Sequence, residues 1–211
     1  MRRPDPKAIF TRYAVAWLYL AIFVVAEVVY ALLAPHDLAA FTGWASTNVH
    51  NLRHDPIGSL VVSAFVTQGF AIAWPALIAL AMFGANRALG NWRTIVVCAA
   101  GQVIGTLVSE GIVGYQVSRG LLPTSDRYII DVGPSYVVVA AIVVALLYGS
   151  WLARAAAALD LALLVGVGGA LLTLLLILAA AALADLGSGV FYEPRRVRDA
   201  LKLPVLGEAV T

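Results

Sequence analysis

Residues 137–147 read VVVAAIVVALL, a run without a single charged or polar side chain. Strands of a membrane barrel alternate apolar with polar residues, and this run does not alternate. A lipid bilayer leaves only helices and closed barrels with all their backbone hydrogen bonds satisfied. The run therefore predicts a transmembrane helix, and with it an all-α fold, a polytopic transmembrane helical bundle.

The chain on either side of this run has the same apolar character. Of its 211 residues, 62% are apolar and 12% are charged, and the mean hydropathy is +0.90. Soluble domains contain about 45–50% apolar residues, so water is not the main solvent of this protein. A bilayer core roughly 30 Å thick needs about 20 apolar residues per helix. Runs of that length predict five spans, at residues 14–34, 60–84, 94–117, 128–152 and 161–184.

Domain organisation follows from the connections between these runs, which are too short to hold a second domain. We expect residues 1–186 to form the transmembrane bundle and residues 187–211 to form a polar C-terminal tail. The longest connection joins the first two spans and mixes aromatic residues with histidines and charges, a composition that suits the membrane interface. Cys98 is the only cysteine, so an internal disulfide is excluded.

The basic residues predict the orientation in the membrane. With a cytoplasmic N terminus, seven of them collect on the cytoplasmic side, Arg2, Arg3, Lys7, Arg12, Arg87, Arg93 and Arg154, and three on the other side, Arg53, Arg119 and Arg127. Because cytoplasmic loops carry an excess of Lys and Arg, we expect a multi-pass protein of the cell membrane with its N terminus inside.

The tail conflicts with this rule, since it carries four more basic residues and would emerge outside after five spans. Two resolutions stay open. The tail lies on the outer surface as a short interfacial helix, or residues 159–186 form two short re-entrant pieces. A sixth span is therefore an alternative to the five that we predict.

The third span contains Gly101-x-x-x-Gly105, a spacing of small residues that lets two helices approach closely in lipid. We expect these glycines to serve helix packing inside the bundle. A homo-oligomer held by the same motif is the second interpretation.

Three carboxylates, Glu27, Glu110 and Asp131, fall inside or at the edge of predicted spans. Each is costly in lipid and is expected to face the bundle or water. A proton or ion relay is the functional interpretation, and a hydrogen-bonded carboxyl that fastens two helices is the structural one. His50 and His54 have the spacing of metal ligands on one helix face, but no Glu or Cys accompanies them at ligand spacing. We predict no metal and no cofactor.

The order of several motifs resembles the rhomboid family of intramembrane serine proteases. A long loop follows the first span, Leu60-Val-Val-Ser-Ala-Phe65 comes next, Phe83-Gly84 and Leu89-Gly90 follow, and Gly133-Pro134-Ser135 opens the fourth span. The segment Asp131-Val-Gly-Pro-Ser135-Tyr136 is similar to one found in actinobacterial rhomboid-like proteins. The resemblance covers about residues 10–186 and implies a rhomboid-like bundle, with Ser135 at the position of the nucleophile.

The same resemblance shows what this chain lacks. The family places Gly after its nucleophile, where this chain has Tyr136, and a His and an Asn on its second helix, where this chain has neither. Its activating histidine lies on a sixth helix, but here the matching stretch is Asp185-Leu-Gly-Ser188, and no histidine follows His54. A serine without a base is a weak nucleophile.

Three functions follow as hypotheses. The leading one is a catalytically inactive rhomboid-like membrane protein that binds a partner helix or lipid through a polar intramembrane cleft, formed by Asp131, Gly133, Ser135, Tyr136 and Glu110. The second is a protease in which Asp131 activates Ser135, although a carboxylate is a poor base for a serine. The third is a small transporter or channel component that uses Glu27, Glu110 and Asp131, for which we find no internal repeat.

The expected partners are membrane lipid and the transmembrane helices of other proteins. Nucleic acid is excluded, because the chain has no phosphate-binding loop and its basic residues stand at helix ends, where topology explains them.

Overall fold

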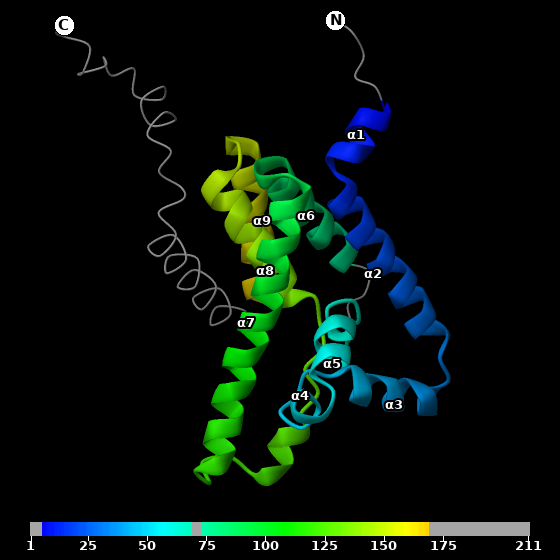
Figure 1. The fold of residues 1–211 in the computed structure, drawn as a ribbon, viewed down its shortest axis with the longest axis vertical. Coiled ribbons are helices and arrows are strands. Elements are labelled where there is room, and N and C mark those ends of the chain that lie inside the picture. The colour runs from blue at the N-terminus through cyan, green and yellow to red at the C-terminus, as the bar shows by residue number, and fades with distance from the viewer. Residues whose placement is uncertain (1–5, 69–72, 169–211) are drawn as a thin grey trace, which may run out of the picture. The chain divides into compact units, whose positions relative to one another are not determined.

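The computed structural model describes residues 6–68 and 73–168, which belong to one compact unit. These residues form helices joined by short connections, without a strand among them (Figure 1). The helices are α1 Pro6–Arg12, α2 Ala14–Leu32, α3 Pro35–Ala45, α4 Asn51–His54, α5 Pro56–Ser63, α6 Trp74–Leu89, α7 Asn91–Ser118, the 3₁₀ helix η1 Thr124–Tyr128, α8 Ser135–Tyr148 and α9 Trp151–Gly168. The all-α prediction is confirmed for this part of the chain. The expected tail at residues 187–211 lies outside the described residues.

Helix α8 is the centre of the bundle. It packs against α6, α7 and α9, and its residues 136–145 are all buried. A helix that is apolar on every side finds its lowest free energy when other helices surround it. The run that decided the fold class in the sequence therefore also decides which helix lies in the middle.

Helices α2 and α7 are, within the described residues, the two that are long and apolar enough to cross a membrane, and α8 is a shorter apolar helix. Only 11% of the apolar window of α2 is buried. Its Val25, Val28 and Leu32 side chains are exposed instead. An apolar surface of this extent is rare on soluble monomers and suits contact with lipid.

The second predicted span, residues 60–84, is wrong as one continuous helix. Helix α5 ends at Ser63, and α6 begins only at Trp74, with Pro75 in its first turn. Proline fits there because the first N–H groups of a helix have no intrahelical partner. The break is fastened by Glu27 of α2, whose Oε1 accepts hydrogen bonds from Thr67 N (2.8 Å) and Thr67 Oγ1 (3.0 Å). Glu27 thus makes the structural contact considered for the carboxylates.

The fourth and fifth predicted spans begin at other residues than expected. Helix α8 starts at Ser135 instead of residue 128, because Pro134 precedes it and Gly133 has a φ of +152°, which side chains disfavour. Helix α9 starts at Trp151 instead of residue 161. Arg154 therefore lies in a helix, where its Nη2 donates to Leu147 O (3.1 Å) near the end of α8. The part of the predicted fifth span after residue 168 falls outside the described residues.

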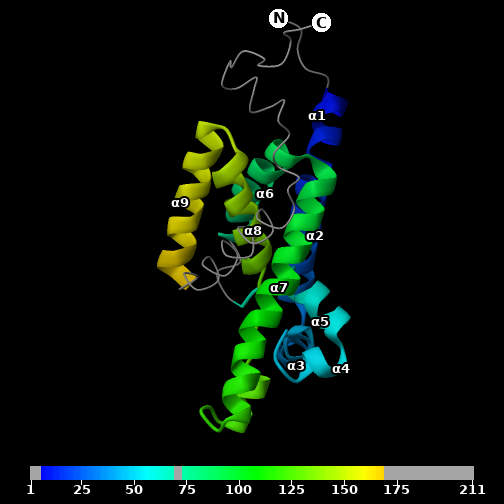
Figure 2. The ribbon, with the colours of Figure 1, turned by 60° about the vertical axis from the view of Figure 1, so that its left-hand side comes forward.

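The long loop after α2 is itself helical and forms α3, α4 and α5. The Nδ2 atom of Asn51 donates to the carbonyls of Gly43 (2.7 Å), Trp44 (3.2 Å) and Ser46 (2.8 Å). One amide therefore closes the end of α3 onto the start of α4. Figure 2 shows these three short helices gathered beside one half of α7.

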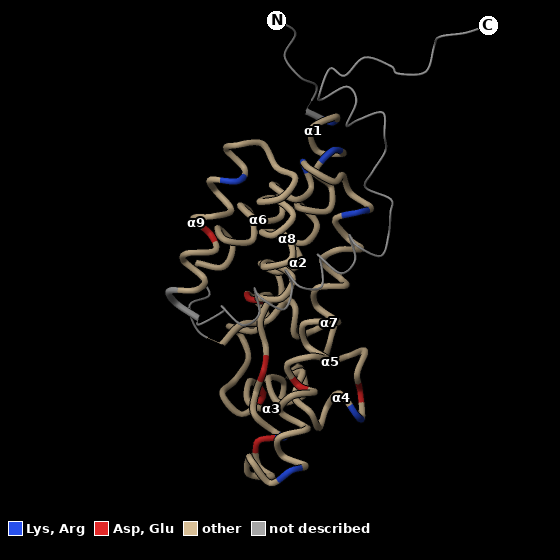
Figure 3. Tube along the Cα trace, turned by 90° about the vertical axis from the view of Figure 1, so that its left-hand side faces the viewer, with Lys and Arg blue, Asp and Glu red and all other residues tan. Residues whose placement is uncertain are grey.

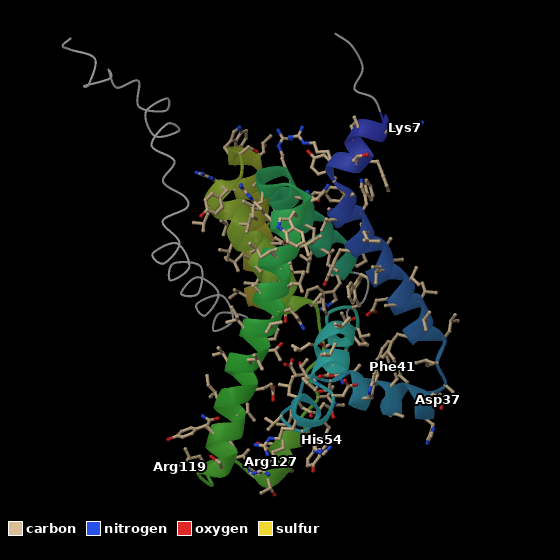
Figure 4. All side chains as sticks on the ribbon, in the orientation of Figure 1. Lys7, Asp37, Phe41, His54, Arg119 and Arg127 are labelled. Atoms are coloured by element: carbon tan, nitrogen blue, oxygen red, sulfur yellow. The ribbon has the colours of Figure 1, made fainter. Side chains whose placement is uncertain are left out.

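The Lys and Arg residues of the described chain lie toward the two ends of the helices, and more of them lie at one end (Figure 3). Figures 1 and 2 place α1, the α6–α7 turn and the α8–α9 turn at the same end, and Figure 3 shows Lys and Arg there. We call this the basic end; its elements carry Lys7, Arg12, Arg87, Arg93 and Arg154. Arg119 and Arg127 lie at the opposite end (Figure 4).

Candidate functional site

The residues before Ser135 are held by hydrogen bonds from two other parts of the chain. Thr47 N donates to Asp131 O (2.8 Å), and His50 N donates to Arg127 O (3.1 Å). Closer to the serine, Gly133 N donates to Ser63 O at the end of α5 (2.9 Å). The segment at residues 127–133 is thus fixed between the loop after α3 and the end of α5, and this fixes the start of α8.

That loop supplies three buried polar side chains in a row, Ser46, Thr47 and Asn48, which are 0%, 2% and 4% exposed. Ser46 Oγ accepts from Asp131 N (2.9 Å) and from Asn48 Nδ2 (3.2 Å). Sequence reasoning missed these residues. Three consecutive polar residues inside an otherwise amphipathic loop were the available signal, because buried polar groups need partners and so mark a contact between elements.

Asp131 lies in this segment, outside the helices. Its Oδ2 accepts from Thr47 Oγ1 (3.1 Å), and its backbone carbonyl accepts from the same hydroxyl (3.0 Å). Burial raises the pKa of Asp131, while the hydrogen bond from Thr47 lowers it. Among the described residues, the Asp131 carboxylate accepts a hydrogen bond from Thr47 and forms none with Ser135.

Glu110 of α7 lies beside the same loop. Its carboxyl group is near enough to the backbone N–H of Val49 and to Asp131 to interact electrostatically with both. In the described ranges neither carboxylate forms an ion pair with a basic residue, Arg119 and Arg127 included. Arg119 follows Glu110 by more than two helical turns, about 13 Å along the axis at 1.5 Å per residue.

Tyr136 joins this group from the first turn of α8. Its hydroxyl donates to Ser109 Oγ (2.7 Å), and its ring lies over Gly105, where an added Cβ would overlap it. One turn further on, a Cβ at Gly101 would come 2.5 Å from Ala140 Cβ. Both glycines of the predicted packing motif therefore face α8, and Gly105 makes the space that the ring of Tyr136 occupies.

Ser135 is half-buried, and among the described residues its hydroxyl has no hydrogen-bond partner. The three histidines are engaged elsewhere. The ring of His50 stacks against Tyr128 (4.8 Å between centroids) and against His54 (4.3 Å). His54 Nδ1 is 2.8 Å from His50 O, and His36 is exposed beside Asp37. No histidine in these ranges bonds to Ser135.

Two buried acceptors next to the site lack a partner within the described part of the chain, Gln102 Oε1 and Thr106 Oγ1. Gln102 Nε2 donates to Ser63 Oγ (3.1 Å), the residue whose carbonyl binds Gly133. Gln102 and Thr106 are four residues apart, so they occupy the same face of α7. They were not singled out in the sequence, because isolated polar residues in an apolar helix carry no pattern.

The structure thus brings Glu110, Asp131 and Tyr136 together and places Gly133 and Ser135 directly beside them in the chain. We call these five residues the polar cluster. Glu27 is not part of it, since its carboxylate bonds to Thr67. Across residues 6–68 and 73–168, no group of three His, Cys, Asp or Glu residues could hold a metal ion. Figure 4 shows His54 and Arg127 at the end of the helices opposite to Lys7.

Comparison with known proteins gives one match. A family model described as rhomboid-like protein matches residues 10–189. No curated protein and no solved structure matches the chain. The matched range contains every residue of the polar cluster and all the helices from α2 to α9.

Proposed function

The chain belongs to the rhomboid-like family, and from this premise we propose that it is a catalytically inactive membrane protein that binds a transmembrane helix of a partner protein through the polar cluster. We further propose that it crosses the cell membrane five times with a cytoplasmic N terminus. The two long apolar helices, the buried α8 and the gathering of basic residues at one end support this orientation.

The isolation of Ser135 is the observation that carries the proposal of inactivity. A serine hydroxyl becomes a nucleophile when a base within about 3 Å takes its proton. Each described histidine has its contacts elsewhere: His50 donates its backbone N–H to Arg127 O, the His54 ring lies at His50 O, and the His36 ring lies at Asp37. The Asp131 carboxylate accepts from Thr47. The sequence has no histidine after His54, so no later helix supplies one.

The polar cluster has hydrogen-bonding capacity left for a partner. Ser135, Asp131 and Glu110 keep partial exposure. Polar side chains that bond across helices in lipid contribute about 0.6 to 2 kcal/mol each. A partner helix with Ser, Thr or Asn at matching depth would satisfy these groups, and a lipid headgroup is the other ligand to be tested.

Inactivity is tested with a fluorophosphonate probe on the full-length protein in detergent and in liposomes. We expect no labelling of the native chain above that of Ser135→Ala. Labelling that disappears in Ser135→Ala would demonstrate an activated serine and overturn the proposal. A genuine rhomboid protease treated in parallel shows that the probe reacts under the same conditions.

Partner binding is tested by photocrosslinking in membranes, with a photoreactive amino acid at Val132, a half-buried residue between Asp131 and Gly133. We expect a crosslink to a membrane-protein helix that persists in Ser135→Ala, is lost in Ser135→Trp and persists in Gly111→Trp. Gly111 is a suitable control, because a side chain there meets nothing within 4 Å. A crosslink to lipid alone, or one that Ser135→Trp does not change, would contradict helix binding.

A further inference from the structure

A second site lies at the basic end, away from the polar cluster. A cavity of about 500 Å³ opens there between the α1–α2 junction, α6 and the α8–α9 turn. Its lining includes Leu80, Phe83 and Arg87 of α6, Tyr13 before α2, and Leu152 of α9, and it contains no acidic residue. The cavity therefore combines apolar walls with one cation.

The apolar wall continues into the outer surface of the protein. Leu80 is 43% exposed and Leu152 is 62% exposed. Behind them, the ring of Phe83 contacts Tyr13 (5.7 Å between centroids) and Trp17 (4.8 Å), which makes a firm aromatic floor. The exposed leucines therefore offer an apolar surface that leads into the cavity.

Arg87 is free to bind an anion. It is exposed and forms no ion pair or hydrogen bond with the described residues. Arg12, Arg93 and Arg154 belong to the same end, so the local potential is positive. Trp92 and Trp151 are both 73% exposed at this end. Exposed tryptophans sit at the level of lipid headgroups, which places Arg87 at the depth of lipid phosphates.

We propose that this cavity binds an anionic glycerophospholipid, with its phosphate at Arg87 and an acyl chain over Leu80 and Leu152. Charge complementarity selects the headgroup, because a basic cavity between helices at the membrane surface attracts anionic lipids. The apolar wall fits the acyl chain of a phospholipid, which a free phosphate ion does not have.

The experiment is native mass spectrometry of the full-length protein with added phosphatidylglycerol or phosphatidylcholine. The native chain is expected to retain phosphatidylglycerol in preference. Arg87→Gln is expected to weaken that binding about fivefold, the weight of one basic residue near an anionic surface, and Arg87→Lys to restore most of it. Arg93→Gln is the matched control, since it removes the same charge at the same end but does not line the cavity.

Ala79→Trp tests the cavity itself, because Ala79 is part of the lining and a tryptophan would fill it. We expect lipid retention to fall in this variant and to persist in Ala155→Trp on the exposed side of α9. Equal retention of the two lipids would overturn the proposal. The proposal would also be overturned if Arg93→Gln lost as much lipid binding as Arg87→Gln, or if soluble glycerol phosphate displaced the lipid. Size-exclusion profiles show which variants fold.

Discussion

Tyr136, directly after Ser135, is a residue in which this chain departs from the rhomboid proteases that it resembles. Where that family has a second glycine after its serine, this chain has a tyrosine, and its ring occupies the space over Gly105. Its hydroxyl is bonded to Ser109. This departure from the protease pattern therefore makes a packed contact between α7 and α8.

Gly105→Ala is predicted to destabilise the fold, because its Cβ would overlap the Tyr136 ring. Overpacking of this kind costs about 1–3 kcal/mol. The free energy of unfolding of the variant and of the native chain is measured in mixed detergent micelles. Gly111→Ala on the same helix has open space around its Cβ and is predicted to be neutral or slightly stabilising. Equal stability of the two variants would contradict this account of the contact.

Tyr136→Phe is predicted to lower the free energy of unfolding by about 0.5–1.5 kcal/mol, the net worth of one hydrogen bond. The variant keeps the ring over Gly105 and removes only the bond to Ser109. Tyr115→Phe serves as the control, because Tyr115 is 61% exposed on the same half of α7. If both variants lost the same free energy of unfolding, the hydrogen bond to Ser109 would make no specific contribution to stability.

At the scale of elements, the short loop between α3 and α4 holds the segment that leads into α8. It closes onto itself through Asn51 and onto the segment before α8 through Ser46 and Thr47. Since that segment ends at Ser135, the loop determines where the polar cluster lies. A helix that begins after a glycine and a proline would otherwise have a poorly fixed start.

Asn51→Ala is predicted to loosen this loop, because it removes the donor from three carbonyl groups at once. The net loss of a hydrogen bond costs about 0.5–1.5 kcal/mol. Limited proteolysis is expected to cut the loop faster in this variant than in the native chain. Arg53→Ala, an exposed neighbour in α4, is expected to be cut at the native rate. Unchanged cleavage in Asn51→Ala would show that the amide does not hold the loop.

At the scale of the whole molecule, orientation in the membrane is the testable property. We predict that Arg87→Cys and Arg154→Cys are shielded from a membrane-impermeant maleimide in intact cells, while Arg119→Cys reacts. Cys98 is buried and contributes no background. Permeabilised cells are the control, in which all three positions should react. Labelling of Arg87→Cys and Arg154→Cys in intact cells would reverse the proposed orientation.

The sequence by itself determined the helical class, the position of α2 and α7, and the family. The helices follow from a local requirement, because a helix that spans a bilayer needs an unbroken apolar run of residues. The family resemblance is local too, because it rests on short motifs of neighbouring residues. Only the tertiary structure decided that residues 60–84 are interrupted, that α9 begins at Trp151, and that Ser46 and Thr47 hold the segment before Ser135. The interruption and the segment before Ser135 each depend on a polar group that finds its partner far away in the chain, as Thr67 finds Glu27. Inside a bundle, the backbone can depart from helical geometry only where such a partner replaces the lost hydrogen bonds. Local sequence does not show which distant residues will pair, so only the tertiary structure could reveal these interruptions.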